Sequence, residues 1–176
     1  MDPFLARDVA ELSAIRRARF ALRLAWLRVR WGGRFQASGR AFVGRAVRFE
    51  LLRGGLVVLG TDAWIAPGAR IRADGGEVRI GPGSVIGDAA MILSTERITI
   101  GSGCLVGDRA ALIDHTWRAD DVERPVRLQG VVGAAVVLAD GARVGAGAVV
   151  GPGAVVDGEV EVGAVVGGAA LRAGAL

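Results

Sequence analysis

The only histidine of the chain, His115, lies in the one long interruption of an otherwise regular sequence, between Leu112 and Val132. A neutral imidazole takes up a proton near pH 7, so this residue is a candidate general base. Polar segments that loop out of a regular scaffold often carry function. The alternative is that His115 is an ordinary surface residue. The side chains that accompany it are Asp114, Trp117, Arg118, Asp120, Asp121 and Gln129.

The numbers of His and Cys residues argue against a zinc site and an internal disulfide. One His and one Cys, Cys104, cannot supply the ligands of a structural zinc site from a single chain, so we expect no metal. A single Cys also excludes an internal disulfide, which favours a cytoplasmic location. Cys104 occupies a small position of the repeat described below, which predicts a packing role.

Charge is concentrated at the N-terminus. All 22 basic residues are Arg, and eight of them lie in residues 1–34 against three acids, a net charge of +5. The remaining 14 Arg face 15 acids, a net charge of −1. The main domain therefore carries no basic surface that would indicate nucleic-acid binding.

A six-residue repeat runs through the chain from about Val43 and decays after Val156. Each repeat begins with an aliphatic residue, continues with a small one, and has a second small residue at its fifth position. Such hexapeptide repeats are typical of β-helices, in which each hexad forms one face of a triangular coil. The aliphatic residue and the fifth residue should both point inward. The aliphatic positions are Leu59, Ile65, Ile71, Ile80, Ile86, Ile100, Val106, Leu112, Val132, Leu138, Val144 and Val150.

The N-terminal segment has helical spacing from Phe4 to Trp31, and Gly32-Gly33 ends it. Its longest run without a charge, residues 24–27, is too short to span a membrane. Two apolar stripes support two interpretations: the helix packs on the domain or a partner subunit, or it lies on an anionic membrane surface. The first stripe is Leu5, Val9, Leu12, Ile15, Ala18, Leu22, Trp26 and Val29; the second is Phe20, Leu24, Leu27 and Trp31. We place a basic amphipathic helical segment at 1–34 and the β-helix at 35–176, with its loop at about 113–131.

The segment from Val43 to Leu176 resembles the hexapeptide-repeat acyltransferases. The resemblance implies a left-handed parallel β-helix and a homotrimer with active sites between subunits. The interruption resembles the loop of bacterial sugar and polysaccharide O-acyltransferases, whose Asp-His-x-His-Arg motif precedes acids and a Pro-Ile/Val-x-x-Gln-Gly run. The matching residues are Asp114, His115, Arg118, Asp120, Asp121, Pro125, Val126, Gln129 and Gly130, while Trp117 replaces the second His.

This resemblance implies an acyl-CoA-dependent O-acyltransferase, with acetyl-CoA as the expected co-substrate and a hydroxylated sugar or polysaccharide precursor as acceptor. His115 would act as general base. The residues leave open which group orients its ring: Asp114 is adjacent but would point the other way in an extended chain, so Asp120, Asp121 or a backbone carbonyl is an equal alternative. The remaining polar and aromatic loop residues would bind the acceptor. Coenzyme A would run past Ala139, Asp140, Gly151 and Pro152 and meet Arg172. The Trp and Asp that usually follow the loop are missing, as are the Asn and Pro of the closing motif. A weakened or inactive scaffold protein is therefore the alternative.

Overall fold

The computed structural model describes residues 14–114 without a break. Beyond them it describes the short segments 126–128, 131–132, 137–138, 143–145, 149–151, 154–156 and 158–166. The predicted His115 and most of its neighbours lie outside this part of the chain.

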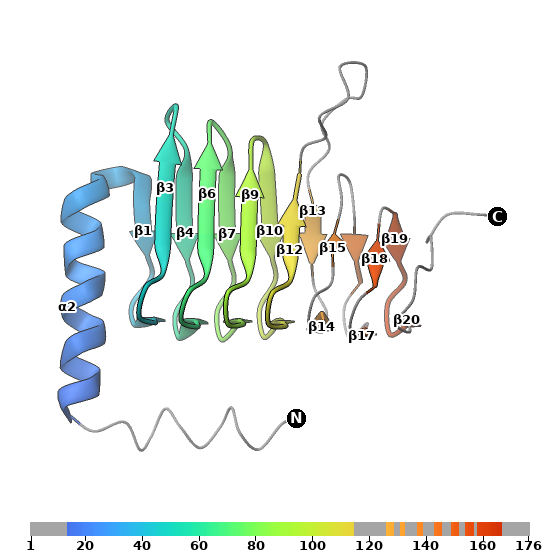
Figure 1. The fold of residues 1–176 in the computed structure, drawn as a ribbon, viewed down its shortest axis with the longest axis horizontal. Coiled ribbons are helices and arrows are strands. Elements are labelled where there is room, and N and C mark those ends of the chain that lie inside the picture. The colour runs from blue at the N-terminus through green and yellow to red at the C-terminus, as the bar shows by residue number, and fades with distance from the viewer. Residues whose placement is uncertain are drawn as a thin grey trace.

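Three parallel sheets form the described part of the molecule (Figure 1). The first sheet contains β1 (Phe35–Ala37), β4 (Leu56–Leu59), β7 (Glu77–Ile80), β10 (Arg97–Ile100), β13 (Val126–Leu128), β16 (Arg143–Val144) and β19 (Glu159–Val160). The second contains β2 (Ala41–Val43), β5 (Ala63–Ile65), β8 (Val85–Ile86), β11 (Leu105–Val106), β14 (Val131–Val132), β17 (Val149–Val150) and β20 (Val165–Val166). The third contains β3 (Arg48–Leu52), β6 (Arg70–Asp74), β9 (Met91–Ser94), β12 (Ala111–Ile113), β15 (Val137–Leu138) and β18 (Val155–Val156).

Each strand pairs with the strand three places further along the chain, so the three sheets wind as a parallel solenoid. Residues 35–113 form four complete turns of three strands each. The predicted all-β solenoid with an N-terminal helix is thus confirmed, and its form is consistent with the left-handed β-helix that the resemblance implies. The solenoid begins at Phe35, before the repeat becomes recognisable in the sequence.

The inward register follows the repeat. Ile65, Ile86 and Val106 pair in succession across three turns, and none of them is exposed. The small fifth positions are also buried, including Ser84 and Cys104, and burial raises the pKa of the Cys104 thiol. Cys104 therefore has the packing position that the repeat predicts.

The structure corrects the repeat at one place. In the hexad that starts at Ile71 the fifth residue, Gly75, is not buried as predicted. It is exposed, with φ +77°, in a corner turn. Beyond Val156, where the repeat decays, the solenoid continues: Val144 pairs with Val160, and Val150 pairs with Val166. These last turns are shorter, so the six-residue period no longer marks them.

Close stacking of the coils explains a glycine that follows an inward residue. A Cβ on Gly81 would lie 2.4 Å from the carbonyl oxygen of Gly101 in the next turn, far inside van der Waals contact. Gly81 also donates its N–H to the carbonyl of Ile100 at 2.8 Å. The second residue of the hexad is therefore small because the backbone of the next coil occupies the space a side chain would need.

Helix α2 (Ala14–Trp31) lies across the N-terminal end of the solenoid (Figure 1). It ends where Gly32-Gly33 predicts, and a short 3₁₀ turn, η1 (Gly32–Arg34), leads into β1. Leu24 and Leu27 are buried in the same apolar core as the first turn. The second predicted stripe thus packs on the solenoid and covers its interior. In the part of the chain that is described, no helix is both long and apolar enough to cross a membrane.

Candidate active-site corner

The connections from the third sheet to the first lie at one edge of the solenoid, and we call this edge the loop corner. They consist of residues 53–55 after β3, 75–76 after β6, 95–96 after β9, and 114–125 after β12. The first three appear together at one end of the strands in Figure 1. The predicted catalytic loop at about 113–131 thus begins at the corner where each preceding coil turns, but its predicted end is too late, because residues 126–128 and 131–132 already form β13 and β14.

The solenoid resumes in register after this connection. Ile98 of β10 pairs with Val126 of β13, and Val106 of β11 pairs with Val132 of β14. The interruption of the repeat is thus an insertion at a corner and leaves the stacking of the coils intact. A segment inserted in this way can change in sequence without disturbing the core.

A column of inward-facing residues lies beside the loop corner and changes from apolar to polar from one coil to the next. Leu51 pairs with Ala73, and Ala73 pairs with Ser94. Asp114 continues the column, because Ile113 before it pairs with Leu93. All four residues are buried, so the column passes from apolar to polar at the turn from which the long connection leaves.

Asp114 holds this turn together. Its Oδ2 accepts a hydrogen bond from Ser94 Oγ at 2.6 Å, and its Oδ1 accepts one from the N–H of Thr95 at 2.7 Å. The N–H of Glu96 donates to Oδ2 at 3.2 Å. The carboxylate is completely buried, and charge-assisted bonds of this kind are stronger than neutral ones. We call Asp114 and the turn Ser94–Glu96 the Asp114 clamp.

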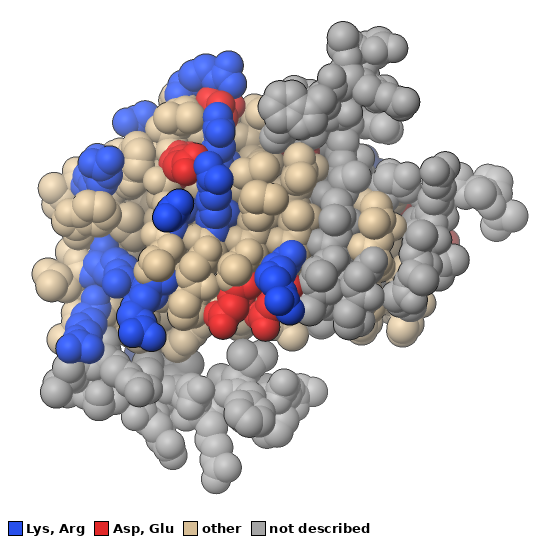
Figure 2. All heavy atoms as spheres, viewed as in Figure 1, with Lys and Arg blue, Asp and Glu red and all other residues tan. Residues whose placement is uncertain are grey.

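Ion pairs line the outer side of the same corner. Asp74 accepts a hydrogen bond from Arg53 Nε at 2.6 Å and one from Arg72 at 2.8 Å, and these bonds lower its pKa to about 2. On the neighbouring sheet, Glu77 pairs with Arg79 and Arg97. Figure 2 shows basic and acidic side chains side by side over these strands. At this corner Arg53, Arg72, Arg79 and Arg97 are therefore matched by acids.

We expect Asp74 to stabilise the fold at neutral pH and to stop doing so in strong acid. Its folded-state pKa is lower than the ordinary value of 3.8, so its contribution is complete above about pH 4 and is lost as the pH falls through about 2. The variant Asp74→Asn should melt below the wild-type protein at pH 6, and the two melting temperatures should converge near pH 2. Asp88→Asn, at an exposed position outside this cluster, serves as control. A difference that persists unchanged at pH 2 would show that the charge of Asp74 is not its cause.

Most of the predicted site residues cannot be placed. His115, Trp117, Arg118, Asp120, Asp121 and Gln129 lie outside the described residues, as do Ala139, Asp140, Pro152 and Arg172. Gly151 is described: it follows β17, is partly exposed, and donates its N–H to the carbonyl of Val166 at 2.7 Å. Among the described residues no group of three or more His, Cys, Asp or Glu side chains could hold a metal ion.

Sequence reasoning missed the partners of Asp114. Ser94, Thr95 and Glu96 lie one coil earlier, and the twenty-residue spacing of the neighbouring coils would have placed Ser94 beside Asp114. The six-residue repeat conceals this relation, because the extra corner residues shift its register between coils. The spacing between equivalent residues of neighbouring coils was therefore the sequence signal that could have identified the partners of Asp114.

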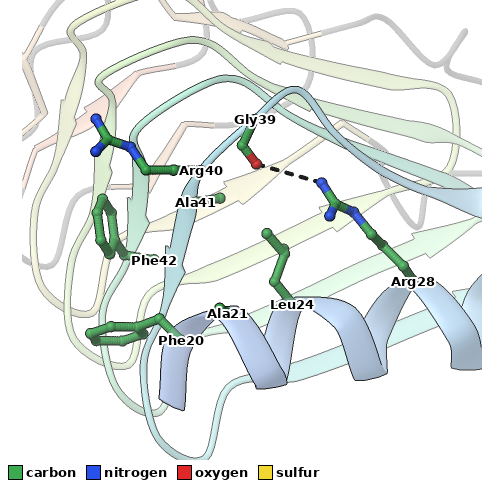
Figure 3. Close-up of a pocket in the computed structure, with 8 residues that line it drawn as sticks. All are labelled: Phe20, Ala21, Leu24, Arg28, Gly39, Arg40, Ala41 and Phe42. Atoms are coloured by element: carbon green, nitrogen blue, oxygen red, sulfur yellow. Dashed lines mark hydrogen bonds between the residues drawn. The ribbon is translucent and has the colours of Figure 1, made fainter. Parts of the chain in front are cut away.

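A separate pocket of about 340 Å³ lies between α2 and the first turn of the solenoid (Figure 3). Phe20 and Leu24 of the helix face Phe42 across it. Its two guanidinium groups already have partners: Arg28 donates to the carbonyl of Ala37 at 2.8 Å, and Arg40 pairs with Asp62 at 3.2 Å. This pocket therefore belongs to the joint between helix and solenoid and lies apart from the loop corner.

The fold of the chain is similar to that of a known structure. The chain is similar to the crystal structure of the polySia-specific acetyltransferase NeuO, with 20% identity and a TM-score of 0.55 over 78% of this chain and 79% of that one. It is also similar to a hexapeptide transferase family protein from Anaplasma phagocytophilum, with 17% identity and a TM-score of 0.47 over 79% of each chain. No protein-family model and no curated protein matches the chain. At such identity the likeness to NeuO concerns the fold, which is the hexapeptide-repeat β-helix that the sequence resemblance indicates.

Proposed function

We propose that the protein is an acyl-CoA-dependent O-acyltransferase that acetylates a hydroxyl group of a sugar or glycan precursor. The observation that carries this proposal is the Asp114 clamp. It fixes the residue next to the only His of the chain to the rigid solenoid, at the corner from which the long connection leaves. The loop motif supports the same activity, and the acetyltransferase NeuO has a similar fold.

The proposed reaction needs one base and no covalent enzyme intermediate. His115 removes the proton from the acceptor hydroxyl as its oxygen attacks the thioester carbonyl, and a backbone N–H stabilises the resulting oxyanion. The carbon–sulfur bond then breaks, the ester forms, and the coenzyme A sulfur takes the proton from the imidazolium. No metal takes part in this scheme.

Asp114 serves the reaction indirectly in this proposal. Its carboxylate is completely buried and bonded within the clamp, so we assign it to positioning the loop and not to contact with the acceptor. Trp117, Arg118, Asp120, Asp121 and Gln129 remain the proposed acceptor-binding residues. Asp120, Asp121 or a carbonyl remains the proposed partner of the His115 ring.

The proposal also includes the co-substrate and the assembly. Acetyl-CoA would pass Ala139, Asp140, Gly151 and Pro152, and Arg172 would meet its phosphates. Gly151 is partly exposed and carries no side chain, so a ligand of this kind could pass close to it, while its N–H stays bonded to Val166. We propose a homotrimer in the cytoplasm, at or near the inner face of the membrane, with a polysaccharide precursor as acceptor.

Loss of the Ser94 hydroxyl should slow the reaction without weakening the binding of acetyl-CoA. In Ser94→Ala the buried Asp114 carboxylate loses the 2.6 Å bond that joins it to the neighbouring coil, so the start of the loop is less well fixed. We expect kcat to fall about tenfold, since small misplacements of catalytic groups are costly, while KM for acetyl-CoA stays the same.

Ser84→Ala is the matched control, because Ser84 is equally buried and its hydroxyl also links two coils, through Gly101 and Cys104. It should lower the melting temperature to a similar degree and leave kcat unchanged. Equal losses of kcat in the two variants would mean that Ser94 acts only through overall stability.

Calorimetric titration of the full-length protein with acetyl-CoA tests the proposed function. The proposal expects saturable binding, weakened when Arg172 is replaced by Ala. Absence of binding at millimolar acetyl-CoA would remove the acyltransferase proposal and favour the scaffold alternative.

A further inference from the structure

Helix α2 has a second apolar face that the solenoid does not cover. Leu22, Trp26 and Val29 are 73%, 58% and 85% exposed, whereas Leu24 and Leu27 on the packed side are 5% and 4% exposed. With 3.6 residues per turn, the exposed residues share one stripe on the side of the helix opposite the packed residues. We call this stripe the outer face of α2.

The outer face has positive charge along one edge. The helix contains six Arg and no Asp or Glu. Arg19 is exposed one turn before Leu22, and Arg30 lies one turn after Trp26 with its guanidinium carbon 5.7 Å from the centre of that ring. Figure 2 shows basic side chains over this helix. An apolar stripe with arginines along one edge matches the boundary between acyl chains and anionic headgroups.

The distribution of charge within the molecule also favours an anionic lipid surface as the partner of the outer face. On and beside the third sheet, three arginines are matched by acids: Arg70 pairs with Glu50, and Arg53 and Arg72 pair with Asp74. The helix has no acid of its own to match its arginines. The arginines of α2, which no acid in the helix offsets, therefore lie on the same helix as the exposed apolar stripe. This helix lies at one end of the solenoid (Figure 1).

We propose that the outer face of α2 binds the surface of a membrane rich in anionic lipid. The helix lies in the plane of the surface, with Leu22, Trp26 and Val29 among the upper acyl chains and Arg19 and Arg30 at the phosphates. The solenoid then projects away from the membrane from its N-terminal end, because the opposite side of the helix packs on the first turn. A nucleic acid would match the arginines but not the apolar stripe. This inference does not depend on the proposed acyltransferase activity.

Co-sedimentation of the full-length protein with vesicles tests this inference. The protein should sediment with vesicles of phosphatidylcholine and phosphatidylglycerol and not with vesicles of phosphatidylcholine alone. Binding should weaken in about 1 M salt, where charges are screened beyond about 3 Å. The double variant Leu22→Asp, Val29→Asp should reduce the bound fraction by about tenfold or more, because two apolar side chains no longer leave water.

The matched control is Leu52→Asp, Val155→Asp, which replaces a Leu and a Val that are 42% and 45% exposed on the solenoid. It changes the net charge equally, so it should retain most of the binding. Failure of the wild-type protein to bind the anionic vesicles, or equal losses in both double variants, would overturn the proposal. A change of oligomeric state confined to the α2 variant, with vesicle binding unaltered, would assign the outer face to contact between copies of the chain and would also overturn it.

Discussion

Replacement of His115 by Ala should lower the rate of acyl transfer by about 10²- to 10⁴-fold, the usual contribution of a general base. His115 is the only His of the chain, so no neighbouring imidazole can take over its role. The fold should be unaffected, because the connection that carries His115 is inserted at a corner and the strands on either side pair in register with the coil before it. The measurement is the steady-state release of coenzyme A with a sugar acceptor, together with a melting curve.

Arg79→Ala is a suitable control for this experiment. Arg79 lies on the outer surface of the first sheet, and its side chain is 57% exposed. It should transfer acyl groups at the wild-type rate. A His115→Ala protein with normal turnover would remove His115 from the mechanism, whatever the fate of the acyltransferase proposal.

Ile86→Asp should abolish stable folding. Ile86 is completely buried and pairs with Ile65 in one neighbouring coil and Val106 in the other. The substitution removes an aliphatic side chain from the core and puts a carboxylate without a partner in its place. Together these changes cost at least about 4 kcal/mol, a large part of the stability of an ordinary domain. Circular dichroism and thermal melting of the purified variant provide the measurement.

The control is Arg79→Asp, which introduces the same side chain at an exposed position of a neighbouring strand. It breaks the surface ion pair with Glu77, and such pairs contribute about 1 kcal/mol or less. We expect a small change in the melting temperature. Similar effects of the two substitutions would show that the inward register is wrong.

The repeat made most of the fold predictable from sequence. The aliphatic positions face inward because each coil buries them against the coils on either side, and this requirement recurs every six residues. Ile65 and Ile86 could be assigned to the core in this way. The end of the helix was equally clear, because Gly32-Gly33 interrupts the helical spacing after Trp31.

Other features depend on contacts between coils that no local pattern reveals. The Asp114 clamp joins residues twenty positions apart, and the corner turns that separate them break the six-residue period. The repeat decays in the last coils, within the predicted 35–176 β-helix, for a related reason: Val160 and Val166 still pair with the preceding coil, but their turns are shorter than the ideal.

The two stripes of the N-terminal helix show where sequence reasoning ended. Both have the spacing of a buried face, so the sequence allowed either packing or membrane contact. The structure separates them, because the solenoid has room for only one side of the helix. Leu24 and Leu27 pack, while Leu22 and Val29 are left exposed.

One measurement tests the central proposal most directly: mass spectrometry of a sugar acceptor after incubation with the full-length protein and acetyl-CoA. The proposal predicts that the acceptor gains an acetyl ester, that coenzyme A appears in equal amount, and that both products are nearly absent with His115→Ala. A panel of hydroxylated sugars and glycans that gains no acetyl group, with acetyl-CoA left intact beside correctly folded protein, would contradict it.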